Sequence, residues 1–396
     1  MSVVGIVTII GFCFLFSKDR RNINWTPVIW GLGLQFIFGL LILKTYPDQF
    51  FAGAQALFMG IYKFADKGAG FLFGSLVENK DFVILSMGSV IIFVSSLMAI
   101  LNYLRILPAI IYGLARVMQW TLRTSGAETL AAAIFVLMGI EGITGLKTVI
   151  ARMTRSELFT VMTCFMATIA GSVMAVYVGV FGANAGYIFA ASIMSAPAAL
   201  ALSKMMVPET ETPETSGRVE WKILIPEDRG VVEAAAGGAV DGLKLAVTIG
   251  AILLAFVSLI HMLNAGCDAL FGYPFTTLGG YVFAPVAYLL GVPWEDCLNA
   301  GNLLAVKTIF NEWLAYSDMK TMVAAAQLSP RSVMILTYAL CSFANFGSLA
   351  ILIGGVSGIA PSRKDDAVSM GLRAMLTGLL AGFLTASVAG VLMDTA

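Results

Sequence analysis

Two stretches of the sequence decide its fold: LLAVKTIFNEWLA at Leu303–Ala315 and IFVLMGIEGI at Ile134–Ile143. Each stretch is apolar, contains small or helix-breaking residues, and carries one carboxylate, Glu312 in the first and Glu141 in the second. An ionisable side chain at bilayer depth is costly, so it needs a partner or a water-filled cavity. Two such segments in one chain indicate a transporter built from two repeats, with its site near the membrane midplane.

The overall composition excludes a soluble globular protein. Of the 396 residues, 59% are hydrophobic and only 12% are charged, whereas charged residues make up about a quarter of a soluble domain. Lys plus Arg and Asp plus Glu both number 24, so the charge balance gives no indication of nucleic acid binding. Five cysteines without C-x-x-C spacing and a single histidine predict neither a disulfide framework nor a histidine-based metal site.

Hydropathy predicts eight membrane-spanning helices, because a span needs about 20 apolar residues. They are expected at Val3–Phe16, Thr26–Leu43, Phe82–Leu101, Leu158–Val180, Tyr187–Met206, Leu243–Leu263, Ser332–Val356 and Met370–Leu392. Between them, Phe50–Val77 and Leu104–Trp120 are apolar but interrupted by charges, which favours helices lying on the membrane surface. The expected fold is therefore an all-α polytopic membrane protein.

The segments around the two carboxylates, Ser125–Ala151 and Trp294–Met319, are too apolar for ordinary loops. Re-entrant helical hairpins fit them best, because non-helical backbone at membrane depth is tolerated where protein or a wet cavity surrounds it. Gly139, Gly142 and Gly145 supply the flexibility that a hairpin tip requires. The alternative for each segment is an ordinary transmembrane helix with one snorkelling glutamate.

The order of the segments predicts two inverted repeats. Thr154-Arg155-Ser156 and Pro330-Arg331-Ser332 each precede an apolar helix that reaches a Gly-Ser pair at the same offset, and the linker Pro208–Arg229 separates the two. Five units are expected: N-terminal spans and surface helices forming a scaffold at 1–121, the first repeat at 122–207, a cytoplasmic linker with a surface helix at 208–240, a scaffold helix with a surface segment at 241–293, and the second repeat at 294–396.

The polar residues in these segments predict a binding site. Two carboxylates that face one cavity, Glu141 and Glu312, could grip neighbouring hydroxyls of a sugar or polyol. Asn345 and Ser348 lie three apart on one helical face, and the ring of Phe343 could stack on a planar ligand. The alternative is that Asn345 and Ser348 only join helices through interhelical hydrogen bonds. Beside two buried carboxylates, we favour the binding site.

These segments resemble the concentrative nucleoside transporter family. NEWLAY at Asn311–Tyr316 is similar to the family's NEFVAY motif, and YALCSFANFGS at Tyr338–Ser348 is similar to its YALCGF-[AS]-NFSS helix. The similarity extends from about Phe71 to the C-terminus. The resemblance implies a homotrimer of eight-span protomers with two re-entrant hairpins, multi-pass in a bacterial cytoplasmic membrane. Each protomer would import nucleosides by an elevator-type movement of its hairpin-bearing domain.

The resemblance also implies roles for individual residues. Glu141 would face the nucleobase, Glu312, Asn345 and Ser348 would hold the ribose hydroxyls, and Phe343 would line the pocket. The expected partners are a nucleoside, the lipid bilayer and two further copies of the chain. No cofactor, enzymatic activity or nucleic acid is expected.

The first hairpin departs from the family pattern, which reads NIFV-[GS]-Q-[TS]-EAP where this chain has AIFVLMGIEGI at Ala133–Ile143. Gly139 and Ile140 stand where the family has its base-reading Gln and Thr, and the sodium-ligating Asn has no counterpart. Of the sodium site, the resemblance leaves the hydroxyl of Thr168 and the backbone carbonyl of Ile169.

This departure has two expected consequences. A hard cation wants several oxygen ligands, so we expect coupling to protons through Glu141 or Glu312, with sodium coupling as the alternative. An apolar wall at Gly139 and Ile140 cannot hydrogen-bond a base edge through side chains, so base selectivity should be relaxed. Two other functions stay open: a permease for another polar solute, and an intramembrane enzyme that uses the two glutamates as acid and base.

Overall fold

The fold is all-helical in the computed structural model, which describes residues 1–45, 47–76, 83–217, 219, 221–225 and 228–393. A few side chains within these ranges, including those of Ile140 and Glu141, lie outside the described part. The secondary structure of the described residues therefore agrees with the all-α fold that the sequence predicts.

The helices follow the expected order along the chain. The N-terminal part contains α1 Ser2–Leu15, α2 Trp25–Leu40, α3 Pro47–Phe73, α4 Val83–Tyr103 and α5 Ile106–Leu122. The first half continues with α6 Gly126–Leu137, the 3₁₀ segment η4 Gly139–Leu146, α7 Lys147–Ile150, α8 Arg155–Ala167, α9 Gly171–Gly179 and α10 Ala185–Met206. The second half contains α11 Val231–Phe271, α12 Phe275–Leu290, α13 Cys297–Ile309, α14 Glu312–Ala324, α15 Pro330–Leu340, α16 Phe346–Ile359 and α17 Lys364–Leu392.

Six helical segments among the described residues are long and apolar enough to cross a membrane: Trp25–Lys44, Ile84–Tyr103, Arg155–Gly179, Ala185–Met206, Val231–Phe271 and Pro361–Leu392. The apolar helices α1 and α16 are shorter. The segment expected as one span at Ser332–Val356 is divided between α15 and α16. The predicted all-helical, multi-span architecture is confirmed, and the number of spans stays a prediction.

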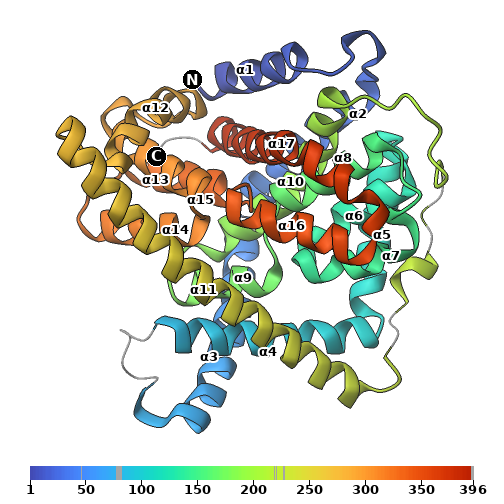
Figure 1. Ribbon diagram of the computed structural model, residues 1–396, viewed down its shortest axis with the longest axis horizontal. Coiled ribbons are helices and arrows are strands. Elements are labelled where there is room, and N and C mark those ends of the chain that lie inside the picture. Colours follow the sequence, from blue (N-terminus) through green and yellow to red (C-terminus); the bar gives the residue numbers. More distant parts are fainter. Residues whose placement is uncertain (46, 77–82, 218, 220, 226–227, 394–396) are drawn as a thin grey trace.

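The longest helix corrects one sequence prediction. Instead of a span at Leu243–Leu263 preceded by a surface helix, α11 is continuous over 41 residues, about 60 Å at 1.5 Å per residue. Two of its glycines, Gly238 and Gly242, pack tightly on α4. A Cβ on Gly242 would lie 2.8 Å from the Cα of Ile92. Figure 1 shows α11 crossing the molecule diagonally, with α4 across its lower part.

The first hairpin reverses direction at a glycine. Helix α6 starts in a capping box, in which the amide of Glu128 donates to Ser125 Oγ and Glu128 Oε2 accepts from the amide of Ser125. After α6, Gly139 has φ +64, a left-handed conformation that glycine adopts without steric cost. A Cβ on Gly142 would lie 2.1 Å from Ile134 Cγ2, so the returning arm lies directly on the outgoing one.

Two helices are broken where the sequence has small and polar residues. One break, at residues 168–170, separates α8 from α9, and the other, at residues 341–345, separates α15 from α16. The breaks meet in the interior, because the amide of Phe343 donates to the carbonyl of Thr168 at 3.2 Å. The most apolar part of α8–α9 is entirely buried, whereas only 11% of that part of α11 is. The broken helix α8–α9 therefore lies in the core, and α11 lies at its edge.

A buried ionic cluster holds the outer end of the first hairpin. The ammonium of Lys204, at the end of α10, pairs with Glu128, lies 3.2 Å from Glu209 Oε2, and donates to Ser156 Oγ at 2.9 Å. The linker joins this cluster, since Thr215 Oγ1 accepts from the amide of Ala127 at 3.0 Å. Part of the linker therefore packs against the start of α6 instead of extending into solvent.

Candidate functional site

Asparagine residues begin both helices that carry the site. The side chain of Asn311 caps α14 by accepting from the amide of Leu314 at 3.0 Å. The side chain of Asn345 caps α16 by accepting from the amide of Ser348 at 2.8 Å. Because asparagine is among the preferred N-cap residues, the helices start where these residues stand. Glu312 is then the first residue of α14.

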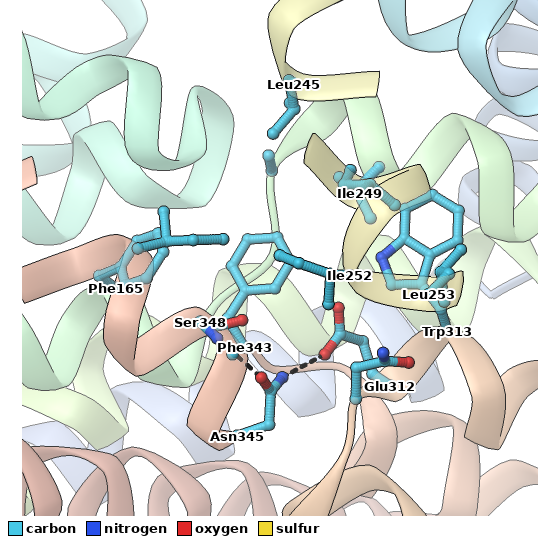
Figure 2. Close-up of a pocket in the computed structure, with 15 residues that line it drawn as sticks. Phe165, Leu245, Ile249, Ile252, Leu253, Glu312, Trp313, Phe343, Asn345 and Ser348 are labelled. Carbon is cyan, nitrogen blue, oxygen red and sulfur yellow. Dashed lines mark hydrogen bonds between the residues drawn. The ribbon is translucent and has the colours of Figure 1, made fainter. Parts of the chain in front are cut away.

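The carboxylate of Glu312 is buried and held at both oxygens. Only 2% of the residue is exposed, and a buried charge needs hydrogen-bond partners. The side-chain amide of Asn345 donates to Oε2 at 2.7 Å, as Figure 2 shows, and the hydroxyl of Tyr177 donates to Oε1 at 3.0 Å. An ionised carboxylate has about four acceptor positions, so it can still accept hydrogen bonds from a ligand.

The carboxylate faces a cavity of about 600 Å³, counting its open mouth. The polar groups come from α14 and the break before α16, and the aromatic rings of Phe165, Trp313 and Phe343 lie beside them. The rings of Phe165 and Phe343 are 5.5 Å apart between centroids. The cavity therefore combines hydrogen-bonding groups with aromatic faces.

The opposite wall of the cavity is a continuous apolar face of α11. It consists of Leu245, Ile249, Ile252 and Leu253. Their spacing of three and four residues places them on one side of the helix. Hydrogen bonding to a ligand in this cavity is therefore available from the broken-helix side, while α11 offers only apolar contact.

A buried lysine lies close behind the site. Lys307 is fully buried, its ammonium donates to Ser342 Oγ at 2.7 Å, and it lies 5.9 Å from the ring centroid of Phe383. Lys307 lies five residues before Glu312 in the sequence. Within the described part of the chain, the two side chains do not form an ion pair. Lys307 instead binds the unwound segment that leads to Asn345.

The predicted residues of the second half come together. Glu312, Phe343, Asn345 and Ser348 all line the cavity, although they belong to a hairpin and a broken helix that are separate in the sequence. Asn345 also joins two helices, as the alternative interpretation proposed. Its side-chain amide caps α16 and donates a hydrogen bond to Glu312 at the start of α14. Their roles toward a ligand stay a prediction.

The first hairpin contributes differently. Gly139 forms the hairpin turn and is not among the residues that line this cavity. The neighbouring Leu137 and Met138 line a second cavity, together with Ser172 and Asp241. The side chains of Ile140 and Glu141 lie outside the described part of the chain, so the expected meeting of the two carboxylates is not described either.

The remnant of the sodium site does not fit a hard cation. The hydroxyl of Thr168 donates to the carbonyl of Cys164 at 2.9 Å, and its own carbonyl accepts from the amide of Phe343. Ile169 is buried and offers a carbonyl only. The described residues contain no group of three or more His, Cys, Asp or Glu that could hold a metal. Thr168 offers one hydroxyl oxygen and Ile169 one backbone carbonyl, fewer oxygen ligands than such an ion prefers.

Sequence reasoning missed the α11 residues, Phe165 and Trp313 that line the cavity, and it missed Tyr177, which binds Glu312. Tyr177 is fully buried in α9, six residues after Gly171, and its hydroxyl reaches Glu312 from the other half of the chain. Its ring stacks on that of Tyr316 with centroids 4.5 Å apart. The available signal was a phenol in the middle of an apolar span, since a buried tyrosine hydroxyl usually has a hydrogen-bond partner.

The sequence matches three families along most of its length. Residues 4–76 match the family described as Na+ dependent nucleoside transporter N-terminus, residues 84–184 match Nucleoside recognition, and residues 187–390 match Na+ dependent nucleoside transporter C-terminus. The matches cover both carboxylate segments and the N-terminal helices. The resemblance noted in the two carboxylate segments therefore extends beyond them.

Individual relatives agree with these matches. The chain is 40% identical to "Uncharacterized transporter YutK" of Bacillus subtilis, with 98% of each protein covered. It is 38% identical to "Solute carrier family 28 member 3" of Mus musculus, of which it spans 59%. The fold is similar to that of CNTnw in an inward-facing substrate-bound state, with a TM-score of 0.92, 36% identity, and 99% and 98% of the two chains covered. The chain is a multi-pass membrane protein that belongs to the concentrative nucleoside transporter family, a family of transporters rather than enzymes.

Proposed function

We propose that this protein is an ion-coupled transporter that imports nucleosides across the cytoplasmic membrane. The observation that carries the proposal is the buried carboxylate of Glu312, held by Asn345 at one wall of a cavity between two broken helices. The hydroxyls of a ribose are donors that match a carboxylate acceptor, and Ser348 adds a hydroxyl beside it. The ring of Phe343 offers a face on which a base can stack.

The relatives support this substrate class. The matching families are described as Na+ dependent nucleoside transporter and Nucleoside recognition, and the similar CNTnw structure is described as substrate-bound. The second half of this chain carries the family motifs at Asn311–Tyr316 and Tyr338–Ser348. The ribose side of the site should therefore be the part that this protein shares with its relatives. Relaxed base selectivity is proposed for the other side, where Gly139 and Ile140 replace the family's Gln and Thr.

The proposed movement is of the elevator type within a homotrimer. The apolar face of α11 that lines the cavity, which includes Ile249 and Leu253, offers no hydrogen bonds, so the hairpin-bearing body could slide along it without breaking any. The exposed residues elsewhere on α11, such as Val247 and Leu254, would contact lipid or neighbouring protomers. The division into scaffold and repeats drawn from the sequence remains part of this proposal.

The coupling ion proposed is the proton. The hydroxyl of Thr168 is engaged by its own helix, and the family's sodium-ligating Asn has no counterpart in the first hairpin. A buried carboxylate such as Glu312 can instead carry a proton, and the sequence offers Glu141 as a second carboxylate. Sodium coupling is the alternative that the test must separate.

The test is uptake of labelled uridine by the purified protein in proteoliposomes. A proton gradient imposed alone should drive accumulation, replacing sodium by choline should leave uptake unchanged, and a protonophore should abolish it. Strict dependence on a sodium gradient would overturn proton coupling while leaving nucleoside transport in place. Absence of both uridine binding and counterflow would overturn the nucleoside proposal itself.

A second candidate is a permease for another polar solute. The apolar first hairpin favours this candidate. The Gln and Thr that read the base in the family are replaced by Gly139 and Ile140, whereas the residues proposed to hold the ribose are kept. Competition of labelled uridine uptake by free ribose and by purine and pyrimidine nucleosides separates the two. Ribose competing as well as uridine would favour the second candidate.

A further inference from the structure

Tyr177 connects the two halves of the molecule at the site. It belongs to α9, after the first helix break, and it is fully buried. Its hydroxyl donates to Oε1 of Glu312, which lies 135 residues further along the chain at the start of α14. The first half therefore reaches the carboxylate of the second half directly.

The phenol ring of Tyr177 has one defined position. It stacks on Tyr316 at a centroid distance of 4.5 Å and an interplanar angle of 29°, and it meets Trp313 edge-on at 5.1 Å. The hydroxyl of Tyr316 is itself fixed, because it donates to the carbonyl of Thr337 at 2.8 Å. Rings packed on several sides cannot turn away, so the hydroxyl of Tyr177 stays directed at Glu312.

Two donors from two different broken helices thus set the plane of one carboxylate. Tyr177 binds Oε1 from α9, and the side-chain amide of Asn345 binds Oε2 from the start of α16. A carboxylate held at both oxygens does not lose rotational freedom when a ligand binds, which removes one of the costs of association. About two acceptor positions remain, enough for two adjacent hydroxyls of one ligand.

We propose that Tyr177 is a positioning residue that presets the carboxylate of Glu312 to accept the adjacent 2′- and 3′-hydroxyls of a ribose. The site then selects for an intact cis-diol, and the selection depends on a residue of the opposite repeat. This inference rests on the proposed nucleoside transport and names the residue that orients its ribose-binding group.

The test compares Tyr177→Phe with the matched variant Tyr316→Phe. Both changes remove one buried phenol hydroxyl from the same stacked pair, but only the first removes a donor to Glu312. Uptake of uridine, 2′-deoxyuridine and 3′-deoxyuridine is measured for each protein, with thermal stability in detergent as the folding control. Tyr177→Phe should raise the KM for uridine about tenfold and reduce the preference for uridine over both deoxynucleosides. Tyr316→Phe should leave that preference unchanged.

The outcomes separate this inference from the transport proposal. A wild-type protein that takes up uridine but has no preference for it over the deoxynucleosides overturns the inference, whether or not the variant folds. An unchanged KM and preference in Tyr177→Phe, or an equal loss in Tyr316→Phe, overturns it as well. A wild-type protein that neither binds nor transports any nucleoside overturns the proposed function instead.

Discussion

Each of the two helix breaks interrupts an apolar helix, but the breaks differ in chemistry. At the first break, the hydroxyl of Thr168 bonds within its own helix, and Ala170 begins α9 without a side-chain cap. At the second break, Asn345 caps α16 and also donates to Glu312. The second break is therefore tied to a buried carboxylate through its cap, whereas the first contributes through Tyr177 further along α9.

The comparison separates what a helix break provides, which is polar backbone, from what the side chains around it provide. A broken helix leaves unpaired backbone groups at its ends in either half, so both halves offer polar backbone deep in the molecule. Side chains decide where a ligand can be held, and in the described part of the chain they gather around Glu312. The predictions below therefore compare matched positions in the two halves.

The largest expected effect comes from the buried lysine of each half. Lys204→Met leaves Glu128 buried without its ion-pair partner, which should destabilise the protein by about 3–5 kcal/mol. Lys307→Met removes a hydrogen bond to Ser342 and should cost about 1–3 kcal/mol. Thermal unfolding in detergent measures both. A larger loss of stability in Lys307→Met would contradict the comparison.

The next effect tests the carboxylate itself. Glu312→Gln keeps the size of the side chain but removes its charge and one acceptor oxygen, so uridine binding should weaken by about 100-fold. Calorimetric titration of the purified protein measures it, with size-exclusion behaviour as the folding control. Wild-type affinity in this variant would show that the ribose is held elsewhere, and the first half would then become the candidate.

A smaller effect on uridine uptake is expected from substitutions at the two helix breaks. Asn345→Ala removes the cap of α16, worth about 1 kcal/mol, together with its bond to Glu312, so uridine uptake should fall about tenfold. Thr168→Val keeps the shape of the side chain and removes a hydroxyl that bonds only within its helix. Uptake by Thr168→Val should stay near that of the wild type. Its loss would indicate that Thr168 holds the coupling ion.

The smallest effect concerns the glycine in the first turn of each second helical part, Gly171 in α9 and Gly347 in α16. A Cβ on Gly171 would lie 2.9 Å from the carbonyl oxygen of Leu137, whereas on Gly347 it would lie 3.1 Å from a ring carbon of Phe256. A ring can turn, but a hairpin backbone must shift. Gly171→Ala should therefore lower stability by about 1 kcal/mol and Gly347→Ala by less. Equal unfolding temperatures for the two variants would contradict this.

Much of the second half of the site could be predicted from the sequence because its signals are local. Asn345 and Ser348 are three residues apart and share a helical start, and Glu312 follows another asparagine cap. The length of α11 could not be predicted in the same way. Hydropathy predicted a span only at Leu243–Leu263, whereas close packing of Gly238 and Gly242 on α4 accompanies a longer continuous helix.

By itself, the sequence determined the membrane class and the two carboxylate segments, because hydropathy is a property of one continuous stretch of residues. Only the tertiary structure decided that the breaks meet through Phe343 and Thr168 and that Tyr177 holds Glu312. Those contacts join residues more than a hundred positions apart, and packing of whole helices, which no local pattern encodes, brings them together.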